Sequence, residues 1–147
     1  KYSVIGAQVW GSAAFGNPAP CAVMNGFSGG NQNNEDWLIS PALDLSTLSL
    51  ATLSFQTSTR FNGAPLQLFV STNYDGSSAP NTATWTQITG FNLPVWTSGS
   101  FTPWTTSGGI DLSSYVGNAN VRIAFKYTSN TTAAAAWEVD NVKLIGQ

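Results

Sequence analysis

Hydrophobic and polar residues alternate with a period of two along several short segments of the chain. In Val121–Tyr127, every odd position is apolar or aromatic, whereas Arg122 and Lys126 lie on the opposite face. Residues 52–57 and 66–70 repeat the alternation. Each segment predicts a strand with one face in a core and one in water. We expect further strands at Val4–Trp10, Ala22–Asn25, Trp37–Ser40, Trp85–Ile88 and Trp137–Ile145.

Turn residues separate these segments, and no stretch of ten residues shows the 3.6-residue period of a helix. Eight or nine short strands at this spacing predict an all-β fold of two antiparallel sheets, a β-sandwich with jelly-roll topology. The length of 147 residues fits one domain, residues 1–147. Three long polar connections remain, at 26–34, 73–84 and 91–109.

Composition narrows the classes of function. Charged residues make up 8% of the chain, and the five basic residues are scattered, so no basic stripe favours a nucleic-acid partner. No apolar run is long enough for a membrane-spanning helix. The chain contains no His, which excludes a Ser-His-Asp triad and a His-based zinc site. The single cysteine, Cys21, excludes an internal disulfide and reads as a small buried residue.

One of the polar connections contains three aromatic residues, which is unusual for a loop. The connection 91–109 contains Trp96, Phe101 and Trp104 among Thr, Ser, Pro and Gly. Either these side chains cap an open end of the sandwich, or they form a platform for a ligand. Together with Trp10, they are candidates for stacking on sugar faces, with Asn, Ser and Thr reading the ring hydroxyls.

The carboxylates suggest a structural calcium ion. If Val142 and Leu144 point into the core, Asp140 on the same strand face does so too, and a buried carboxylate needs a counter-charge. The run 31–36 supplies six oxygen-bearing side chains, a donor type that calcium accepts. The candidate metal ligands are Asp140, Asp36, Glu35 and Asn34. Carboxylates held by hydrogen bonds alone are the alternative.

A glycosidase would need two carboxyl groups flanking a cleft. Glu138 and Asp140 share a strand face at a spacing that inversion could use, whereas the adjacent Glu35 and Asp36 should point to opposite faces. Nothing else in the sequence marks a cleft or an acid. We therefore expect no enzyme activity.

Four stretches carry a resemblance to a known family. They are Asn34–Ser46 (NEDWLISPALDLS), Leu68–Gly76 (LFVSTNYDG), the IDLS phrase at 110–113 followed by Val121–Tyr127, and Ala136–Leu144 (AWEVDNVKL). In this order the sequence resembles choice-of-anchor J domains, which are related to cleaved adhesin domains of bacterial proteases and to MAM-type jelly rolls. The resemblance implies a secreted or surface-attached jelly-roll module that assists adhesion or a neighbouring enzyme. It also implies that Asp140 on the last strand holds calcium.

The chain departs from this pattern near its start. Residues 2–12 contain no acidic residue where adhesin-type relatives carry an Asp-Gly-rich calcium loop, and those relatives begin with an additional apolar strand. A missing strand would leave a sheet edge that another chain could fill. The leading prediction is a non-catalytic module that binds a glycan or a surface protein. The alternative is a filament subunit that self-associates by strand exchange, which a terminal segment outside its own sandwich would favour.

Overall fold

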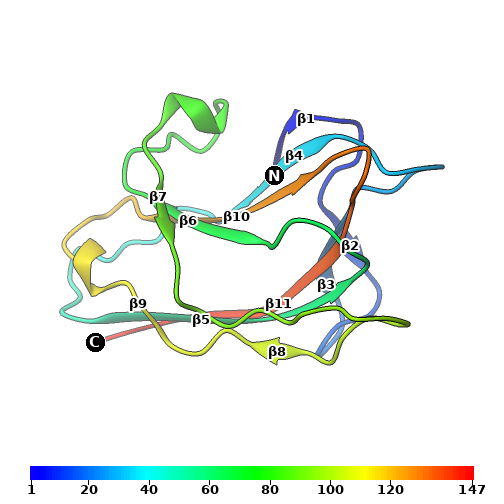
Figure 1. Cartoon of the computed structure of the whole chain (residues 1–147). Helices are drawn as coiled ribbons and strands as arrows, with labels where there is room; N and C mark the ends of the chain where they lie inside the picture. The colour runs from blue at the N-terminus through cyan, green and yellow to red at the C-terminus, as the bar shows by residue number, and fades with distance from the viewer.

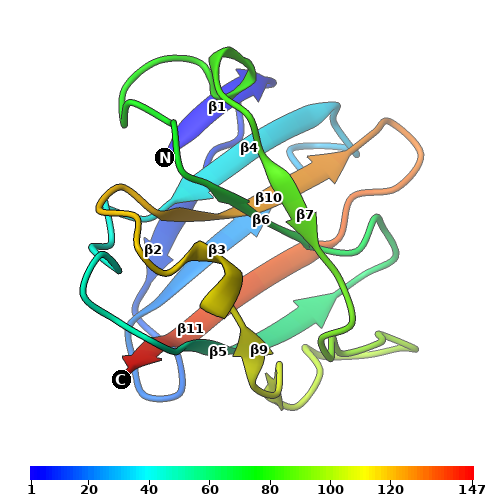
Figure 2. The same cartoon turned by 90° about the vertical axis from the view of Figure 1, so that its left-hand side faces the viewer.

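Two antiparallel sheets pack face to face in the computed structural model, which describes residues 1–147 (Figure 1). In order across the sheet, the strands of sheet A are β1 (Tyr2–Ile5), β4 (Asn34–Ile39), β10 (Arg122–Ser129), β6 (Gln67–Ser71) and β7 (Thr86–Ile88). Those of sheet B are β2 (Gly11–Ala13), β3 (Cys21–Asn25), β11 (Ala136–Gly146), β5 (Ala51–Arg60) and β8 (Thr105–Thr106), with β9 (Ile110–Asp111) also paired to β5. Figure 2 shows the axes of β4 and β10 in one layer nearly aligned with those of β3 and β11 in the other, with each pair antiparallel.

The connectivity is that of a jelly roll. From β3 to β6 each strand crosses to the other sheet, and β10 crosses to β11. The orders β3-β11-β5-β8 and β4-β10-β6-β7 are the two four-stranded sheets of that topology, to which β2 and β1 are added at neighbouring edges. The only helical segments are two 3-10 turns, η1 (Pro80–Thr82) and η2 (Ser113–Tyr115). The predicted all-β jelly-roll sandwich is therefore confirmed. The structure has no helix with the length and apolar character needed to span a bilayer.

The core lies between the sheets and follows the predicted alternation on β10. Ile123, Phe125 and Tyr127 are buried, and the Phe125 ring meets that of Phe55 on β5 edge-on at 4.9 Å between centroids. Trp10 is also buried in this core, at 1% exposure. It is therefore a packing residue, and its candidacy as a sugar-stacking residue was wrong.

A bulge in β11 overturns the expectation for Asp140. Asp140 pairs with Gln56, but Lys143 pairs with Ser54, so one extra residue is inserted on β11, and Asn141 adopts a positive φ of 50°. A bulge reverses which positions face inward. Trp137 and Val139 accordingly enter the core before the bulge and Leu144 packs against it afterwards, while Val142 is exposed. Asp140 lies on the outer face of sheet B.

The N-terminal residues pair within the chain's own sheets. β1 pairs with β4 and β2 pairs with β3, and Gly6, with φ of 95°, lies in the turn that follows β1. The single predicted strand Val4–Trp10 is thus wrong, because this turn divides the segment. A terminal segment lying outside its own sandwich would have favoured strand exchange, and the structure does not show that arrangement. Self-association stays a prediction.

Candidate ligand-binding site

Two cavities open side by side at the end of the sandwich where β5 leaves sheet B. The first, of about 240 Å³, has a mostly apolar wall that includes Leu93, Val95 and Trp137. The second, of about 380 Å³, lies toward residues 25–31 and 132–134. Phe61, Asn62 and Trp96 line both. The same two aromatic side chains therefore belong to both cavities, and we call them the open pair.

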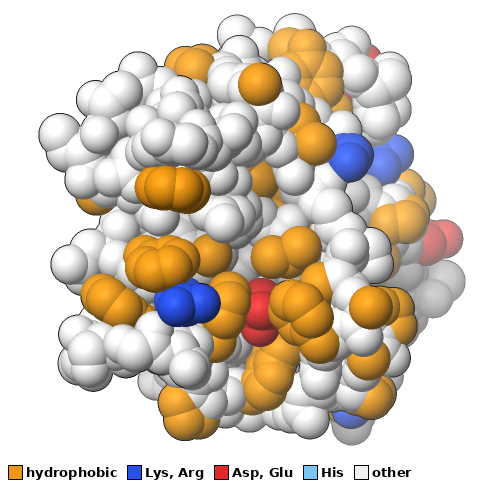
Figure 3. Space-filling model, turned by 90° about the vertical axis from the view of Figure 1, so that its right-hand side faces the viewer, with side chains coloured by type: hydrophobic (Ala, Val, Ile, Leu, Met, Phe, Trp, Pro, Cys, Tyr) orange, Lys and Arg blue, Asp and Glu red, His pale blue; other side chains and the backbone are white.

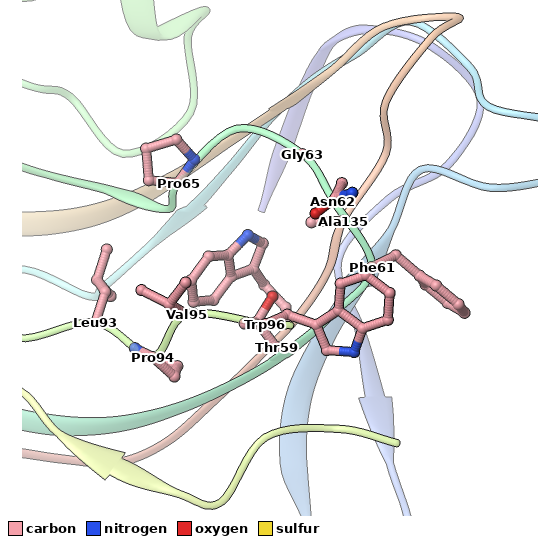
Figure 4. Close-up of a pocket in the computed structure, with 11 residues that line it drawn as sticks. Thr59, Phe61, Asn62, Gly63, Pro65, Leu93, Pro94, Val95, Trp96 and Ala135 are labelled. Atoms are coloured by element: carbon pink, nitrogen blue, oxygen red, sulfur yellow. The ribbon is translucent and has the colours of Figure 1, made fainter. Parts of the chain in front are cut away.

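The open pair comes from two separate connections. Phe61 follows the last residue of β5, and Trp96 belongs to the connection 91–109. Their ring centroids are 5.9 Å apart with planes inclined at 54°, so they are tilted rather than coplanar. Figure 4 shows the Trp96 indole beside the Phe61 ring, with Leu93, Pro94 and Val95 on the other side of the first cavity.

The backbone holds Phe61 in an uncommon conformation. Its φ is 70°, a left-handed value that is unfavourable for an aromatic residue, and the side chain is 41% exposed. Such strain concentrates at ligand sites, where the surrounding structure maintains it. Here Arg60 contributes, because its guanidinium lies 4.6 Å from the Phe61 ring centroid while its Nε donates to the carbonyl of Gly99 at 3.1 Å.

Trp96 is fixed by its polar edge. Its indole Nε1 donates to the carbonyl of Ser100 at 3.1 Å, which orients the ring, and the side chain is half-buried. Val95 beside it is 82% exposed. Figure 3, which faces the right-hand end of the molecule in Figure 1, shows hydrophobic side chains in a band across the lower half of this end, with one basic and one acidic group among them.

The wall of the second cavity is mostly apolar but includes residues with amide and hydroxyl groups. These are Asn25, Asn31, Asn62 and Thr132, next to the exposed ring of Phe27. Neither cavity is lined by a carboxylate. The site thus offers ring faces on one side and neutral hydrogen-bonding groups on the other.

The predicted aromatic residues separate in the structure. Of Trp96, Phe101 and Trp104, only Trp96 lines a cavity. Phe101 and Trp104 are half-buried on the chain leading into β8. Phe61 escaped prediction because its contribution depends on a positive φ, although its place directly after a long alternating strand and before Asn62-Gly63 was a usable signal.

A second aromatic group covers the outer face of sheet A. Trp37 lies 5.2 Å from Phe69 and 5.3 Å from Trp85, and Tyr74 lies 5.3 Å from Trp85, between ring centroids. Trp37 is 6% exposed. We call these four residues the closed cluster. Because the connection between β6 and β7 supplies Tyr74 and Trp85, the outer face of β10 is drier than its alternation predicted.

The predicted metal ligands do not meet at one site. Glu35 and Asp36 point to opposite faces of β4, as predicted. Glu35 lies on the outer face, where it pairs with Lys126 at 3.2 Å and accepts from Trp37 Nε1 at 3.0 Å. Asn34 and Asp36 are both buried. Burial raises the pKa of Asp36 to about 6, although the nearby Ser3 and Lys1 oppose the rise.

Asp140 has its own backbone partners on sheet B. Its Oδ2 accepts from the backbone N–H of Asn17 and its Oδ1 from that of Asn141, both at 2.6 Å. The carboxylate therefore fastens the 14–20 connection to the bulge. The hydrogen-bonded alternative describes Asp140 better than the shared calcium site with residues 34–36.

Glu138 is a buried carboxylate without a cationic partner. The residue is 3% exposed and its side chain accepts no hydrogen bond from the protein. Burial accordingly raises the pKa of Glu138 above its ordinary value. Asp140 lies on the same outer face of sheet B, but neither carboxyl group lines a cavity.

Comparisons with known proteins agree with the fold. A family model described as "Domain of unknown function (DUF5017)" matches residues 24–145. No curated protein sequence matches the chain. Among solved structures, the K1 cleaved adhesin domain of Lys-gingipain from Porphyromonas gingivalis W83 superposes with a TM-score of 0.65 at 18% identity, covering 96% of this chain and 85% of that one.

A more distant similarity links the chain to a protein from Bacteroides thetaiotaomicron VPI-5482 that is provisionally assigned as sugar-binding. The TM-score is 0.45 at 9% identity, with 98% of this chain and 84% of that one covered. The matching family model bears a different description from the families that the four motifs resemble. The adhesin-like β-sandwich implied by those motifs is confirmed as a fold.

Proposed function

The chain belongs to the family described as domain of unknown function DUF5017, and from its geometry we propose that it is a non-catalytic module that binds glycans at the open pair. The observation that carries this proposal is the position of Phe61 and Trp96 between two adjoining cavities, where Phe61 is exposed and Trp96 is half-buried.

The chemistry of the two cavities suits a sugar chain. Pyranose rings present apolar C–H faces, which pack on aromatic rings, and hydroxyl groups around the rim, which bond to amides and hydroxyls. Phe61 and Trp96 supply the rings, and Asn25, Asn62 and Thr132 supply the polar groups. Two cavities around one aromatic pair favour a ligand of at least two sugar units.

The charge around the site favours an uncharged or acidic glycan. No carboxylate lines either cavity. The Arg60 guanidinium lies over the Phe61 ring at the edge of the site and adds positive potential. We place the module in a secreted or surface-attached protein, where such glycans occur.

A matched pair of tryptophan variants tests the proposal. Trp96→Ala should abolish the binding that the wild-type chain shows on a glycan array. Trp104→Ala should retain it, because Trp104 belongs to the same connection but lines neither cavity. Loss of binding in both variants, or in neither, would contradict the proposed site, and so would a wild-type array without any glycan signal.

A further inference from the structure

Buried oxygen atoms without partners gather at the N-terminal segment and the strand it covers. Five buried side-chain atoms in the protein have no hydrogen-bond partner, and three of them are Gln8 Oε1, Asn34 Oδ1 and Asp36 Oδ2. All three are oxygens that can accept but, in an amide or ionised carboxylate, cannot donate. Such buried atoms require an explanation, and an ion is one of the few available.

Asn34 and Asp36 lie on the same inner face of β4, two residues apart. Asp36 pairs with Tyr127 of β10, whose side chain is in the core, and is itself 1% exposed. The Asn34 Nδ2 group donates to the carbonyl of Gln32 at 3.3 Å and to Ser129 Oγ at 3.1 Å. These two bonds fix the amide and turn Oδ1 away from them.

Gly6 lets the turn after β1 approach Asn34 closely. A Cβ at this position would collide with Asn34 Oδ1 and with the backbone carbonyl oxygen of Asn33. These two oxygens therefore pack against the Gly6 backbone, and the positive φ of 95° at Gly6 shapes the turn. Only a residue without a side chain permits this approach.

Gln8 lies in sequence between two residues that contact β4. Gly6 touches Asn34 on one side of it, and on the other side Trp10 Nε1 donates to the backbone carbonyl of Asp36 at 3.3 Å. The amine of Lys1 is engaged with the carbonyl of Trp10 at 2.6 Å, and no lysine or arginine pairs with Asp36. The Asp36 carboxylate thus forms no direct ion pair, although Lys1 lies near enough to oppose the rise in its pKa.

We propose that Gln8, Asn34 and Asp36 bind a divalent cation, with calcium as the best match. Carboxylate and amide oxygens are the hard ligands that calcium takes, and these three oxygens are buried without a partner in the protein. Sites with few charged ligands bind calcium weakly, with Kd of roughly 0.1–1 mM in extracellular modules. The ion would tie the N-terminal segment to β4.

The site differs from the one that the sequence suggested. It keeps Asn34 and Asp36, adds Gln8 and loses both Asp140 and Glu35, whose oxygens have other partners. It is also independent of the glycan site, because none of its residues lines the cavities at the open pair.

Metal titration of the purified chain tests the proposal. Calcium chloride, added after treatment with chelator, should raise Tm saturably, by about 3–6 °C at a tenfold excess over Kd. Terbium should also bind, and its luminescence should be sensitised by Trp10, whose indole N–H donates to the backbone carbonyl of Asp36. Asp36→Asn should abolish both responses, whereas Asp140→Asn, the matched control, should keep them.

The same titration can overturn the proposal. The site would be ruled out if Tm stayed constant at calcium concentrations up to 20 times about 1 mM. An Asp36→Asn variant that responds to calcium like the wild type would also rule it out. If Asp36→Asn does not fold, Gln8→Ala serves instead, since Gln8 lies outside the strands. An unchanged calcium response in folded Gln8→Ala would equally contradict the ligand set.

Discussion

The open pair and the closed cluster are both aromatic groups near the surface, but they differ in what covers their rings. In the closed cluster each ring contacts at least one other ring, and cations lie over two of them: Lys126 is 5.2 Å from the Trp37 centroid and Arg122 is 5.8 Å from that of Tyr74. The open pair has one ring contact, at 5.9 Å, and one cation, Arg60, at 4.6 Å from the Phe61 centroid, but it has cavities on either side.

Aromatic residues on a β-sandwich therefore indicate a ligand site only where they border a cavity that other segments leave open. In the closed cluster, the β6–β7 connection brings Tyr74 and Trp85 onto sheet A, so the rings stabilise the fold. In the open pair, Phe61 and Trp96 come from connections at the end of the sandwich, and no further segment covers them. The first should matter to stability and the second to binding.

The largest effect is expected in the closed cluster. Trp37→Ala removes a nearly buried indole with two ring partners, which should lower the free energy of unfolding by about 3–5 kcal/mol. Denaturation in guanidinium chloride measures the change. A loss below about 1 kcal/mol would mean that the rings of the closed cluster contribute little to the stability of the fold.

The open pair should contribute much less to stability. Trp96→Ala removes a half-exposed ring with a single aromatic contact, so the free energy of unfolding should fall by only about 1 kcal/mol. The same denaturation experiment provides the value. If Trp96→Ala were as destabilising as Trp37→Ala, the indole would be a core residue and the comparison would fail.

The cations over the rings give a smaller and finer test. Lys126→Met should lower stability by about 0.5–1 kcal/mol, because Lys126 contacts both the Trp37 ring and Glu35. Arg60→Met should change stability less but weaken glycan binding, since Arg60 supports the exposed Phe61 ring. Thermal melts and a binding isotherm on each variant measure both effects. If Arg60→Met lowered stability more than Lys126→Met, and Lys126→Met weakened glycan binding, the two aromatic groups would not differ in the way described.

Measuring stability against pH separates the contribution of aromatic packing from that of Glu138, the buried carboxylate that follows Trp137. The pKa of Glu138 is raised in the folded chain, so the folded state holds this proton more tightly than the unfolded chain does. The stability that the protonated group contributes is therefore present below pH 4.5 and lost as pH rises through the raised pKa. Glu138→Gln should be more stable than the wild type at pH 7 and equal to it at pH 4. A difference independent of pH would point to packing instead.

How far the sequence predicts this molecule depends on whether a residue's role is local. The alternation of Val121–Tyr127 predicted β10 correctly, since side-chain direction in a strand follows from position alone. The same reasoning failed at Asp140, because the bulge at Asn141 inserts one residue and no period-two pattern reveals it.

The candidate sites depended still more on long-range contacts. Trp96 was predicted from its unusual loop, but its partner Phe61 lies 35 positions earlier and meets it only through the fold. Gln8 likewise had no sequence signal, because its role comes from the turn at Gly6 that places the N-terminal segment against Asn34.

Two-dimensional NMR of the tryptophan indole N–H groups tests the glycan site most directly. The six indoles of the chain give separate signals, which can be followed while an oligosaccharide identified on the array is added. We predict that the indole of Trp96, and to a lesser degree that of Trp137 in the first cavity, will shift with the ligand, while those of Trp37 and Trp85 stay fixed. A titration in which Trp37 or Trp85 shifts and Trp96 does not would contradict the account.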